Sequence, residues 1–228
     1  MILRQFFDRD TWTYTYLIGD EKSREAAIID PVLERVDREI QTLRELALSL
    51  KYTLDTHVHA DHITGSGVLR EKTGCRTAVA ATNKVDCIDT NLKDGDNLFL
   101  GSLAIKVIAT PGHTDGCLSF LAEDKLFSGD ALFIRGSGRT DFQNGDAGTL
   151  YDSVTGKLFT LPGKTWVYPG HDYNGRTRST IQEERQFNPR FTLSREEFIT
   201  HMDALDLPDP KRIMEAVPAN KACGMIGA

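Results

Sequence analysis

Four side chains that can bind a metal ion fall within six residues of the sequence. They are His57, His59, Asp61 and His62. Neutral imidazole suits zinc, iron and copper, and a carboxylate adds a harder oxygen ligand. Side chains two positions apart on an extended chain point to the same side, so the first two histidines can face one ion. The alternative is a polar loop that is rich in histidine by chance, but five of the six histidines lie in motifs of this kind.

Three later stretches each place a ligand-type residue directly after a glycine. They are Gly112-His113, Gly129-Asp130 and Gly170-His171, and each follows a segment with the pattern of a strand. Glycine permits a sharp turn and a close approach of the backbone. A single pair of this kind is more often structural than functional. Together with residues 57–62, the three pairs predict a metal site where the ends of strands converge.

Composition narrows the classes of function. Hydrophobic content of 40% and charged content of 26% are typical of a globular domain. The net charge of −6 disfavours nucleic acid or an anionic membrane surface as a partner. The sequence shows neither a signal peptide nor an apolar run of membrane-spanning length, so we expect a cytoplasmic protein. The four cysteines form no C-x-x-C pair, and we expect reduced thiols rather than disulfides.

Hydrophobic periodicity gives the elements that must position these residues. We expect strands at residues 2–7, 12–18, 25–30, 51–55, 76–80, 98–100, 103–109, 117–122, 125–128 and 165–168. We expect helices at residues 35–50, 66–73, 147–159, 177–187, 194–204 and 209–216. The order predicts two similar halves that pack sheet against sheet, with helices outside. With no linker or short repeat, we expect one domain over residues 1–228, with a short helical C-terminal segment, about 177–228, packed on it.

The order H-x-H-x-D-H, G-H-T, G-D and G-H resembles the metallo-β-lactamase superfamily over nearly the whole chain. The resemblance implies an α+β fold, an αββα sandwich with the metal site at one edge of the two sheets. The superfamily includes glyoxalase II-type thioester hydrolases, lactamases, nucleases and persulfide dioxygenases. The ligand positions alone therefore do not select an activity.

The segments between the ligands resemble the persulfide dioxygenase family in particular. They are residues 135–143 (RGSGRTDFQ), 149–151 (TLY), 168–173 (YPGHDY), 183–190 (EERQFNPR) and 217–220 (VPAN). The chain departs from that pattern at Ser137, where relatives often carry cysteine. It also begins at its first expected strand, so we expect no transit peptide.

The resemblance implies one Fe(II) per chain, held by His57, His113 and Asp130 in the arrangement of non-haem oxygenases. It implies glutathione persulfide and O₂ as substrates, with sulfite and glutathione as products. The remaining ligand-type residues would orient the first three, with one tyrosine hydroxyl in the same cavity. These residues are His59, Asp61, His62, His171 and Tyr173. The alternative is that they form a second metal site.

Glutathione carries two carboxylates, for which arginine is the natural partner. We expect Arg139 to bind one of them, followed by Arg135 and Arg185 as candidates. A competing hypothesis is a two-metal glutathione thioester hydrolase of the glyoxalase II type, although only 57 residues (228 − 171) follow His171 to form its extra helical domain. A metal-binding scaffold without turnover is disfavoured by the complete ligand set. The sequence does not determine the oligomeric state, and it is compatible with a homodimer.

Overall fold

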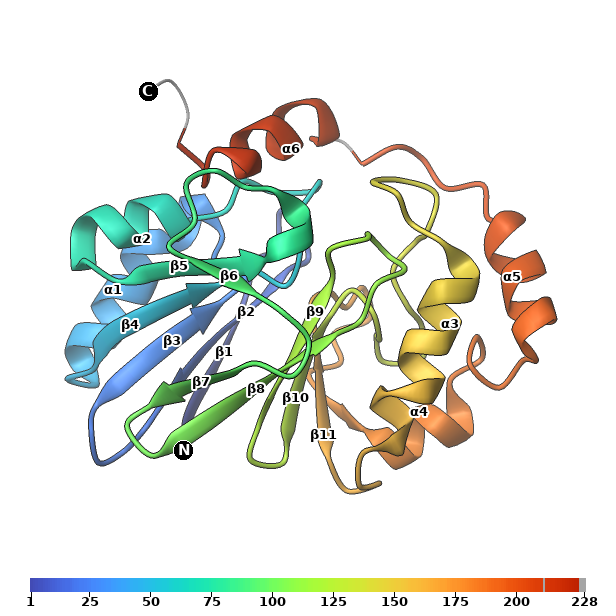
Figure 1. The fold of residues 1–228 in the computed structure, drawn as a ribbon, viewed down its shortest axis with the longest axis horizontal. Helices are drawn as coiled ribbons and strands as arrows, with labels where there is room; N and C mark the ends of the chain where they lie inside the picture. Colours follow the sequence, from blue (N-terminus) through green and yellow to red (C-terminus); the bar gives the residue numbers. More distant parts are fainter. Residues whose placement is uncertain (211, 226–228) are drawn as a thin grey trace.

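Two six-stranded mixed sheets face each other with helices on their outer sides, as the ribbon shows (Figure 1). The computed structural model describes residues 1–210 and 212–225. The strands of the first sheet are β1 (Ile2–Phe7), β2 (Tyr14–Gly19), β3 (Glu25–Ile29), β4 (Ser49–Leu54), β5 (Arg76–Ala80) and β6 (Thr90–Leu92). The strands of the second are β7 (Asn97–Leu100), β8 (Leu103–Ala109), β9 (Leu118–Ala122), β10 (Lys125–Gly129), β11 (Trp166–Pro169) and β12 (Ser179–Thr180). The expected αββα sandwich is confirmed.

The main core lies between the two sheets. Tyr16 of β2 and Phe127 of β10 meet there, with ring centroids 4.9 Å apart, and Tyr168 of β11 packs against both. Side chains alternate between the two faces of a strand, so Leu17 points the other way, into the layer beneath the helices. Because both faces of β2 are covered, every residue of that strand is buried.

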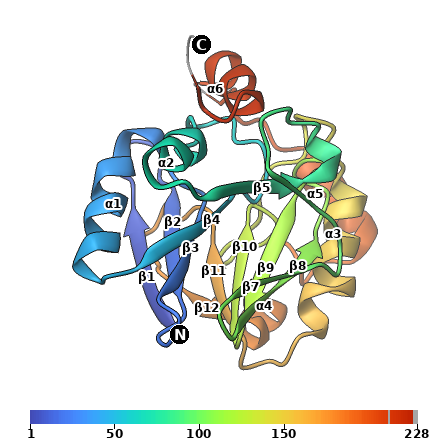
Figure 2. The same ribbon diagram turned by 60° about the vertical axis from the view of Figure 1, so that its left-hand side comes forward.

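Helices cover the outer face of each sheet (Figure 2). Those beside the first sheet are α1 (Val36–Glu45) and α2 (Ser66–Thr73). Those beside the second are α3 (Ala147–Gly156), α4 (Ile181–Phe187) and α5 (Arg195–Asp203). The last helix, α6 (Ile213–Lys221), lies across the end of the sandwich near α2 rather than beside the second sheet. The C-terminal segment thus crosses from one half of the fold to the other.

The expected helix over residues 35–50 was too long. The chain leaves the helix after Glu45, because Ala47 adopts a left-handed φ of 49°, and Leu50 already lies in β4. Apolar residues of the following strand had continued the helical spacing by coincidence. The three-residue strand β6 was missed, because only Leu92 of its side chains is buried.

The boundaries of two C-terminal helices also differ from expectation. Residues 179–180 pair with β11, and α4 begins only after Thr180, whose side chain forms a capping box with Glu183. The expected helix over 209–216 is shifted to α6, and it continues past Pro218. Proline removes a backbone donor from a helix interior, which is why the sequence suggested an earlier end.

None of the described helices is both long and apolar enough to cross a membrane. The cytoplasmic location stays a prediction. So does the expected single domain over residues 1–228.

Glu39 of α1 is a buried acid outside the metal site. Arg38 Nη2 donates to its Oε1 at 3.1 Å, and its Oε2 has no hydrogen-bond partner within residues 1–210 and 212–225. Burial raises the pKa of Glu39 to about 7, against the opposing effect of Arg38. The native chain therefore binds an extra proton between the usual pKa near 4.5 and about 7. Stability falls as the pH rises through that interval, because the unfolded chain ionises without this cost.

We predict that Glu39→Gln, which cannot ionise, flattens the pH dependence of stability. Between about pH 5 and about pH 8, the wild type should lose about 2 kcal/mol of unfolding free energy more than the variant. Urea denaturation at both pH values measures this difference. Glu45→Gln, at an exposed position of the same helix, is the control and should follow the wild type. Parallel curves for wild type and Glu39→Gln would show that the carboxyl titrates normally.

Candidate metal centre

The loop that follows β4, residues 55–65, is held against the first sheet by one carboxylate. We call it the metal loop. Asp30, at the end of β3, accepts hydrogen bonds from Thr56 N at 2.7 Å, Thr56 Oγ1 at 2.9 Å and His59 Nε2 at 3.1 Å. β3 and β4 are parallel neighbours, so their carboxyl ends lie at the same edge of the sheet. The beginning of the metal loop therefore has a fixed position.

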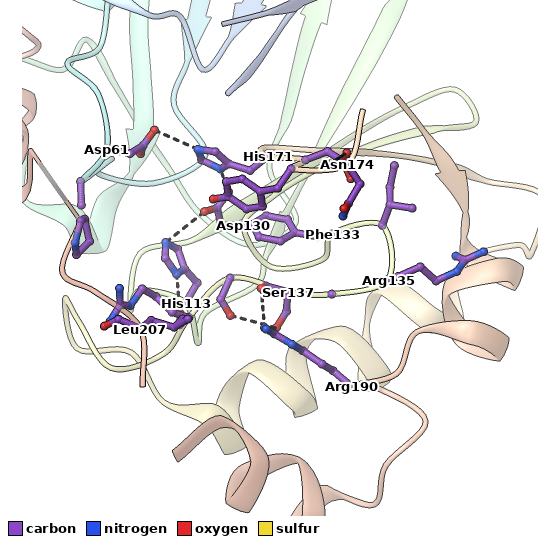
Figure 3. Close-up of a pocket in the computed structure, with 18 of the residues that line it drawn as sticks. Asp61, His113, Asp130, Phe133, Arg135, Ser137, His171, Asn174, Arg190 and Leu207 are labelled. Carbon is purple, nitrogen blue, oxygen red and sulfur yellow. Dashed lines mark hydrogen bonds and ion pairs between the residues drawn. The ribbon is translucent and has the colours of Figure 1, made fainter. Parts of the chain in front are cut away.

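Three expected ligands meet at this edge. One ligand atom each of His57, His113 and Asp130 lies within 4.8 Å of the others. His113 Nε2 is 3.6 Å from Asp130 Oδ2, and Figure 3 shows the two side chains pointing toward each other. They come from the metal loop, the β8–β9 connection and the end of β10, so both sheets contribute. Two imidazoles and one carboxylate form a donor set that suits Fe(II).

Hydrogen bonds fix the orientation of both imidazoles. Thr56 Oγ1 lies 3.0 Å from Nδ1 of His57, and the carbonyl of Arg139 lies 2.6 Å from Nδ1 of His113. Each Nδ1–H therefore donates to an oxygen, which leaves Nε2 of both rings free for a metal ion. Burial lowers the pKa of His57 well below its usual range, so the ring is neutral as a ligand requires.

His171 lies between two carboxylates behind this set. Its Nδ1 donates to Asp130 Oδ1 at 2.8 Å and its Nε2 to Asp61 Oδ2 at 3.1 Å. Burial lowers the pKa of His171, but the charges of Asp130 and Asp61 outweigh it and hold the pKa well above the usual range. Burial raises the pKa of Asp130, but the charge and hydrogen bond of His171 lower it by more, so the pKa of Asp130 lies below its usual range. His171 thus links the two carboxylates and fixes the orientation of the ligand Asp130.

A second group of ligand-type residues lies next to the first. It consists of His59, Asp61 and His62, with one ligand atom of each within 4.8 Å of the others. Asp61 Oδ2 accepts hydrogen bonds from His62 Nδ1 at 2.8 Å and from Thr13 Oγ1 at 3.1 Å. His59 Nδ1 and His62 Nε2 are buried without a hydrogen-bond partner among the described residues. This group has the donors for a metal ion, but one oxygen of its carboxylate, Oδ2, is already engaged by hydrogen bonds.

Two glycines of the ligand motifs are required by close contacts. A Cβ at Gly170 would lie 2.4 Å from Asp130 Oδ1, the oxygen that His171 contacts. A Cβ at Gly112 would lie 2.3 Å from the backbone of Leu150, and its φ is +136°. Only glycine fits either position without displacing its neighbours.

A cavity of about 530 Å³ opens over the three ligands. Arg135 and Arg139 line it, but both guanidinium groups are paired with carboxylates, of Glu184 and Asp141 respectively. Arg185 does not line it; its Nη1 donates to the carbonyl of Phe159 at 3.3 Å.

Tyr173 lines the mouth of the cavity. Its ring lies parallel to that of His171, with centroids 6.2 Å apart. The side chain is largely exposed, so the phenol stands at the entrance rather than deep inside.

Sequence reasoning missed Arg190 as a site residue, although it lies in the 183–190 stretch. Its Nη1 donates to the carbonyl and hydroxyl of Ser137, at 2.8 and 3.0 Å, and Figure 3 shows its guanidinium end pointing toward that residue. The roles of Asp30 and Asn220 in holding the metal loop were also missed. No spacing rule places these side chains at the site, because they come from elements remote in sequence.

The expectation of reduced cysteines was wrong for one pair. Cys87 and Cys223 form a disulfide between positions 136 residues apart. The pair is invisible to spacing rules because it depends on α6 folding back over the connection between β5 and β6. Cys75 and Cys117 are buried free thiols, as expected.

Comparison with known proteins places this chain among close relatives. The model of the metallo-β-lactamase superfamily matches residues 12–171. Persulfide dioxygenase ETHE1, mitochondrial, of Bos taurus is 53% identical over 228 residues, which cover 99% of this chain and 89% of the bovine protein. The Homo sapiens protein of the same name is 52% identical with the same coverage. The crystal structure of ETHE1 from Myxococcus xanthus is 57% identical and superposes with a TM-score of 0.97, over 99% of this chain and 100% of that one.

We predict that Gly170→Ala reduces metal binding, because the added methyl group would displace the Asp130 carboxylate. The expected loss of metal affinity is about tenfold or more, as for other losses of groups that orient ligands. Iron content after competition with a chelator measures it. Gly156→Ala is the matched control, since a Cβ there meets no atom within 4 Å. Equal iron retention in the two variants would contradict the contact.

Proposed function

Because the chain belongs to the metallo-β-lactamase superfamily, we propose that it acts as a persulfide dioxygenase, which oxidises glutathione persulfide with O₂ and water to sulfite and glutathione. The observation that carries this proposal is the similarity to persulfide dioxygenases over almost the full chain, together with a two-histidine, one-carboxylate set at the floor of a cavity. A homodimer and a cytoplasmic location remain predictions.

His57, His113 and Asp130 would hold one Fe(II) per chain. Bound there, the ion would supply the redox chemistry that the reaction of O₂ with a sulfur anion needs. The protein's own contribution is to fix these ligands. Thr56 and the Arg139 carbonyl orient the two imidazoles, and His171 orients the carboxylate. All three ligands line the same cavity, so a substrate that enters it reaches them directly.

The charge network behind the ligands favours one ion over two. His171 donates through both ring nitrogens, and a doubly protonated imidazole has no lone pair for a metal. Asp61, the carboxylate of the second group, accepts hydrogen bonds from His171, His62 and Thr13. In this arrangement Asp61 supports Asp130 through His171, while His59 is hydrogen-bonded to Asp30.

Arg190 is the residue best suited to bind a carboxylate of glutathione. It lines the cavity, and its hydrogen bonds go to uncharged oxygens of Ser137. Burial lowers its pKa, and no carboxylate in the described part of the chain pairs with it. Arg139 also lines the cavity, but it would have to share its guanidinium between Asp141 and the substrate. We therefore place Arg190 before Arg139 in substrate binding, and Arg135 after both.

A two-metal glutathione thioester hydrolase is the second candidate, and one observation favours it. The unpartnered nitrogens of His59 and His62 are what a second ion would need. In that case Asp61 would exchange its hydrogen bonds for a metal, and His171 would give up a proton.

We predict Fe(II)-dependent O₂ uptake and sulfite formation when the enzyme is given glutathione persulfide. An oxygen electrode measures the O₂ consumed and a sulfite assay measures the product of the same turnover. Metal analysis of the purified chain should give about one iron. His113→Ala, which removes a ligand, should contain none. Sulfite formation at an equal rate under nitrogen would contradict the proposal, because a dioxygenase requires O₂. Two metals per chain, with hydrolysis of S-lactoylglutathione at a comparable rate, would establish the hydrolase instead.

We predict that Arg190→Ala raises KM for glutathione persulfide by about tenfold to a hundredfold, because a substrate carboxylate loses a desolvated partner. The kcat should change much less, since the side chain lies away from the ligands. Steady-state kinetics separate the two. Arg185→Ala is the control, because its guanidinium points away from the cavity. A fall in kcat at unchanged KM would assign Arg190 another role.

A further inference from the structure

The side chain of Asn220, in α6, is hydrogen-bonded entirely to the metal loop. Its Oδ1 accepts from the backbone N–H of Thr64 at 2.8 Å. Its Nδ2 donates to the carbonyls of His59 at 2.8 Å and His62 at 2.9 Å. The side chain is buried, so these bonds satisfy three backbone groups that water does not reach. Asn220 is therefore a positioning residue for the loop that supplies His57.

The turn after α6 makes a second contact with the end of this loop. The carbonyl of Cys223 accepts a hydrogen bond from Gly67 N at 3.0 Å, at the start of α2. A Cβ at Gly67 would lie 2.5 Å from that carbonyl oxygen, and one at Gly224 would lie 1.9 Å from the carbonyl oxygen of Thr64. The two backbones meet with no space between them.

Few other contacts hold α6 in place. Val217 and Cys223 pack against a small apolar cluster that contains Val58, Val79 and Val85, and Arg212, just before the helix, pairs with Glu34. Ala216 and Asn220 are its only buried residues. The disulfide between Cys223 and Cys87 ties the end of α6 covalently to the connection between β5 and β6. That connection is in turn held to α2, because the carbonyl of Cys87 accepts a hydrogen bond from Arg70 Nη1 at 2.5 Å. A helix with so thin a core depends on its cross-link more than a well-packed helix does.

We propose that the Cys87–Cys223 disulfide is a redox-sensitive latch that holds Asn220 against the backbone of the metal loop. With the disulfide formed, the last turn of α6 stays on the loop. With it reduced, α6 opens more often, and the backbone groups of His59, His62 and Thr64 lose their partner in each opening. The latch therefore links the thiol state of the surroundings to the order of the metal loop.

Glutathione, a monothiol, is a sufficient reductant. Cys87 is partly exposed, whereas Cys223 is only 1% exposed, so a glutathione thiolate attacks Sγ of Cys87. The sulfur–sulfur bond breaks, and Cys223 leaves as a thiolate that takes up a proton. A second glutathione thiolate attacks the glutathione sulfur of the mixed disulfide, and Cys87 leaves and is protonated. Two thiols are oxidised to glutathione disulfide, and the protein gains two electrons and two protons.

Hydrogen–deuterium exchange of the full-length, metal-loaded chain tests the latch. Thiol titration of denatured protein should find two free thiols after air oxidation and four after glutathione treatment, because Cys75 and Cys117 are free in both states. On reduction, the amides of Thr64 and Gly67 should exchange on the order of tenfold faster. The amides of β9, in the second sheet, should not change. This contrast distinguishes local opening from general loss of stability.

Two variants and a control sharpen the test. Cys87→Ser should show the fast exchange in both buffers. Asn220→Ala should expose the Thr64 amide even with the disulfide intact. Thiol titration of this variant should find two free thiols, which shows that the disulfide has formed. Met214→Ala, at a position of α6 that is 89% exposed, should keep the full redox response.

Four free thiols in air-oxidised protein, or equal exchange at Thr64 and Gly67 in the two redox states of the wild type, would overturn the latch. The wild-type comparison stands even if Cys87→Ser fails to fold. No readout uses catalytic activity. The latch can therefore fail while the dioxygenase proposal holds, and the reverse is also true.

Discussion

A single buried carboxylate, that of Asp30, fixes the start of the loop on which the metal centre depends. It accepts two hydrogen bonds from Thr56 and one from His59, all at the carboxyl end of the first sheet. Thr56 in turn orients His57. The position of this ligand therefore depends on two successive hydrogen bonds, from His57 to Thr56 and from Thr56 to Asp30 at the end of β3. An ionised carboxylate needs such donors when it is buried, and the loop needs the carboxylate. The Asp30 carboxylate and the beginning of the metal loop therefore stabilise each other.

The second constraint is the balance of charge behind the ligands. Asp130 and Asp61 would repel each other if nothing lay between them, and His171 lies there within hydrogen-bond distance of both. Breaking a buried pair of this kind by removing one partner is costly, because the other charge is left uncompensated. The same network occupies both nitrogens of His171 and one oxygen of Asp61, which a second ion would otherwise be able to bind. The hydrogen bonds of His171 with Asp130 and Asp61 therefore affect both the stability of the fold and the number of metal ions that the site can bind.

The C-terminal segment joins the two halves of the fold at the site. Residues around α4 and α5 bring Arg190 and Leu207 to the wall of the cavity. The segment then crosses to the first sheet, where α6 places Asn220 and Cys223 on the metal loop and on α2. Substrate binding and order of the loop are therefore properties of one continuous stretch of chain, which packs on both sheets.

Local patterns in the sequence predicted two sheets packed against each other and a metal site where the ends of strands converge, because strand periodicity and glycine-preceded ligands are local signals. The particular set of His57, His113 and Asp130 was implied by the resemblance to the persulfide dioxygenase family. The sequence also predicted the bounds of α2 and of β5. It did not determine the end of α1, since Leu50 of β4 continues the spacing of that helix. Only the tertiary structure decided that Arg190 rather than Arg185 faces the cavity, and that Cys87 meets Cys223. Those outcomes depend on how helices distant in sequence pack against the sheets, and the residues themselves carry no local pattern that encodes that packing.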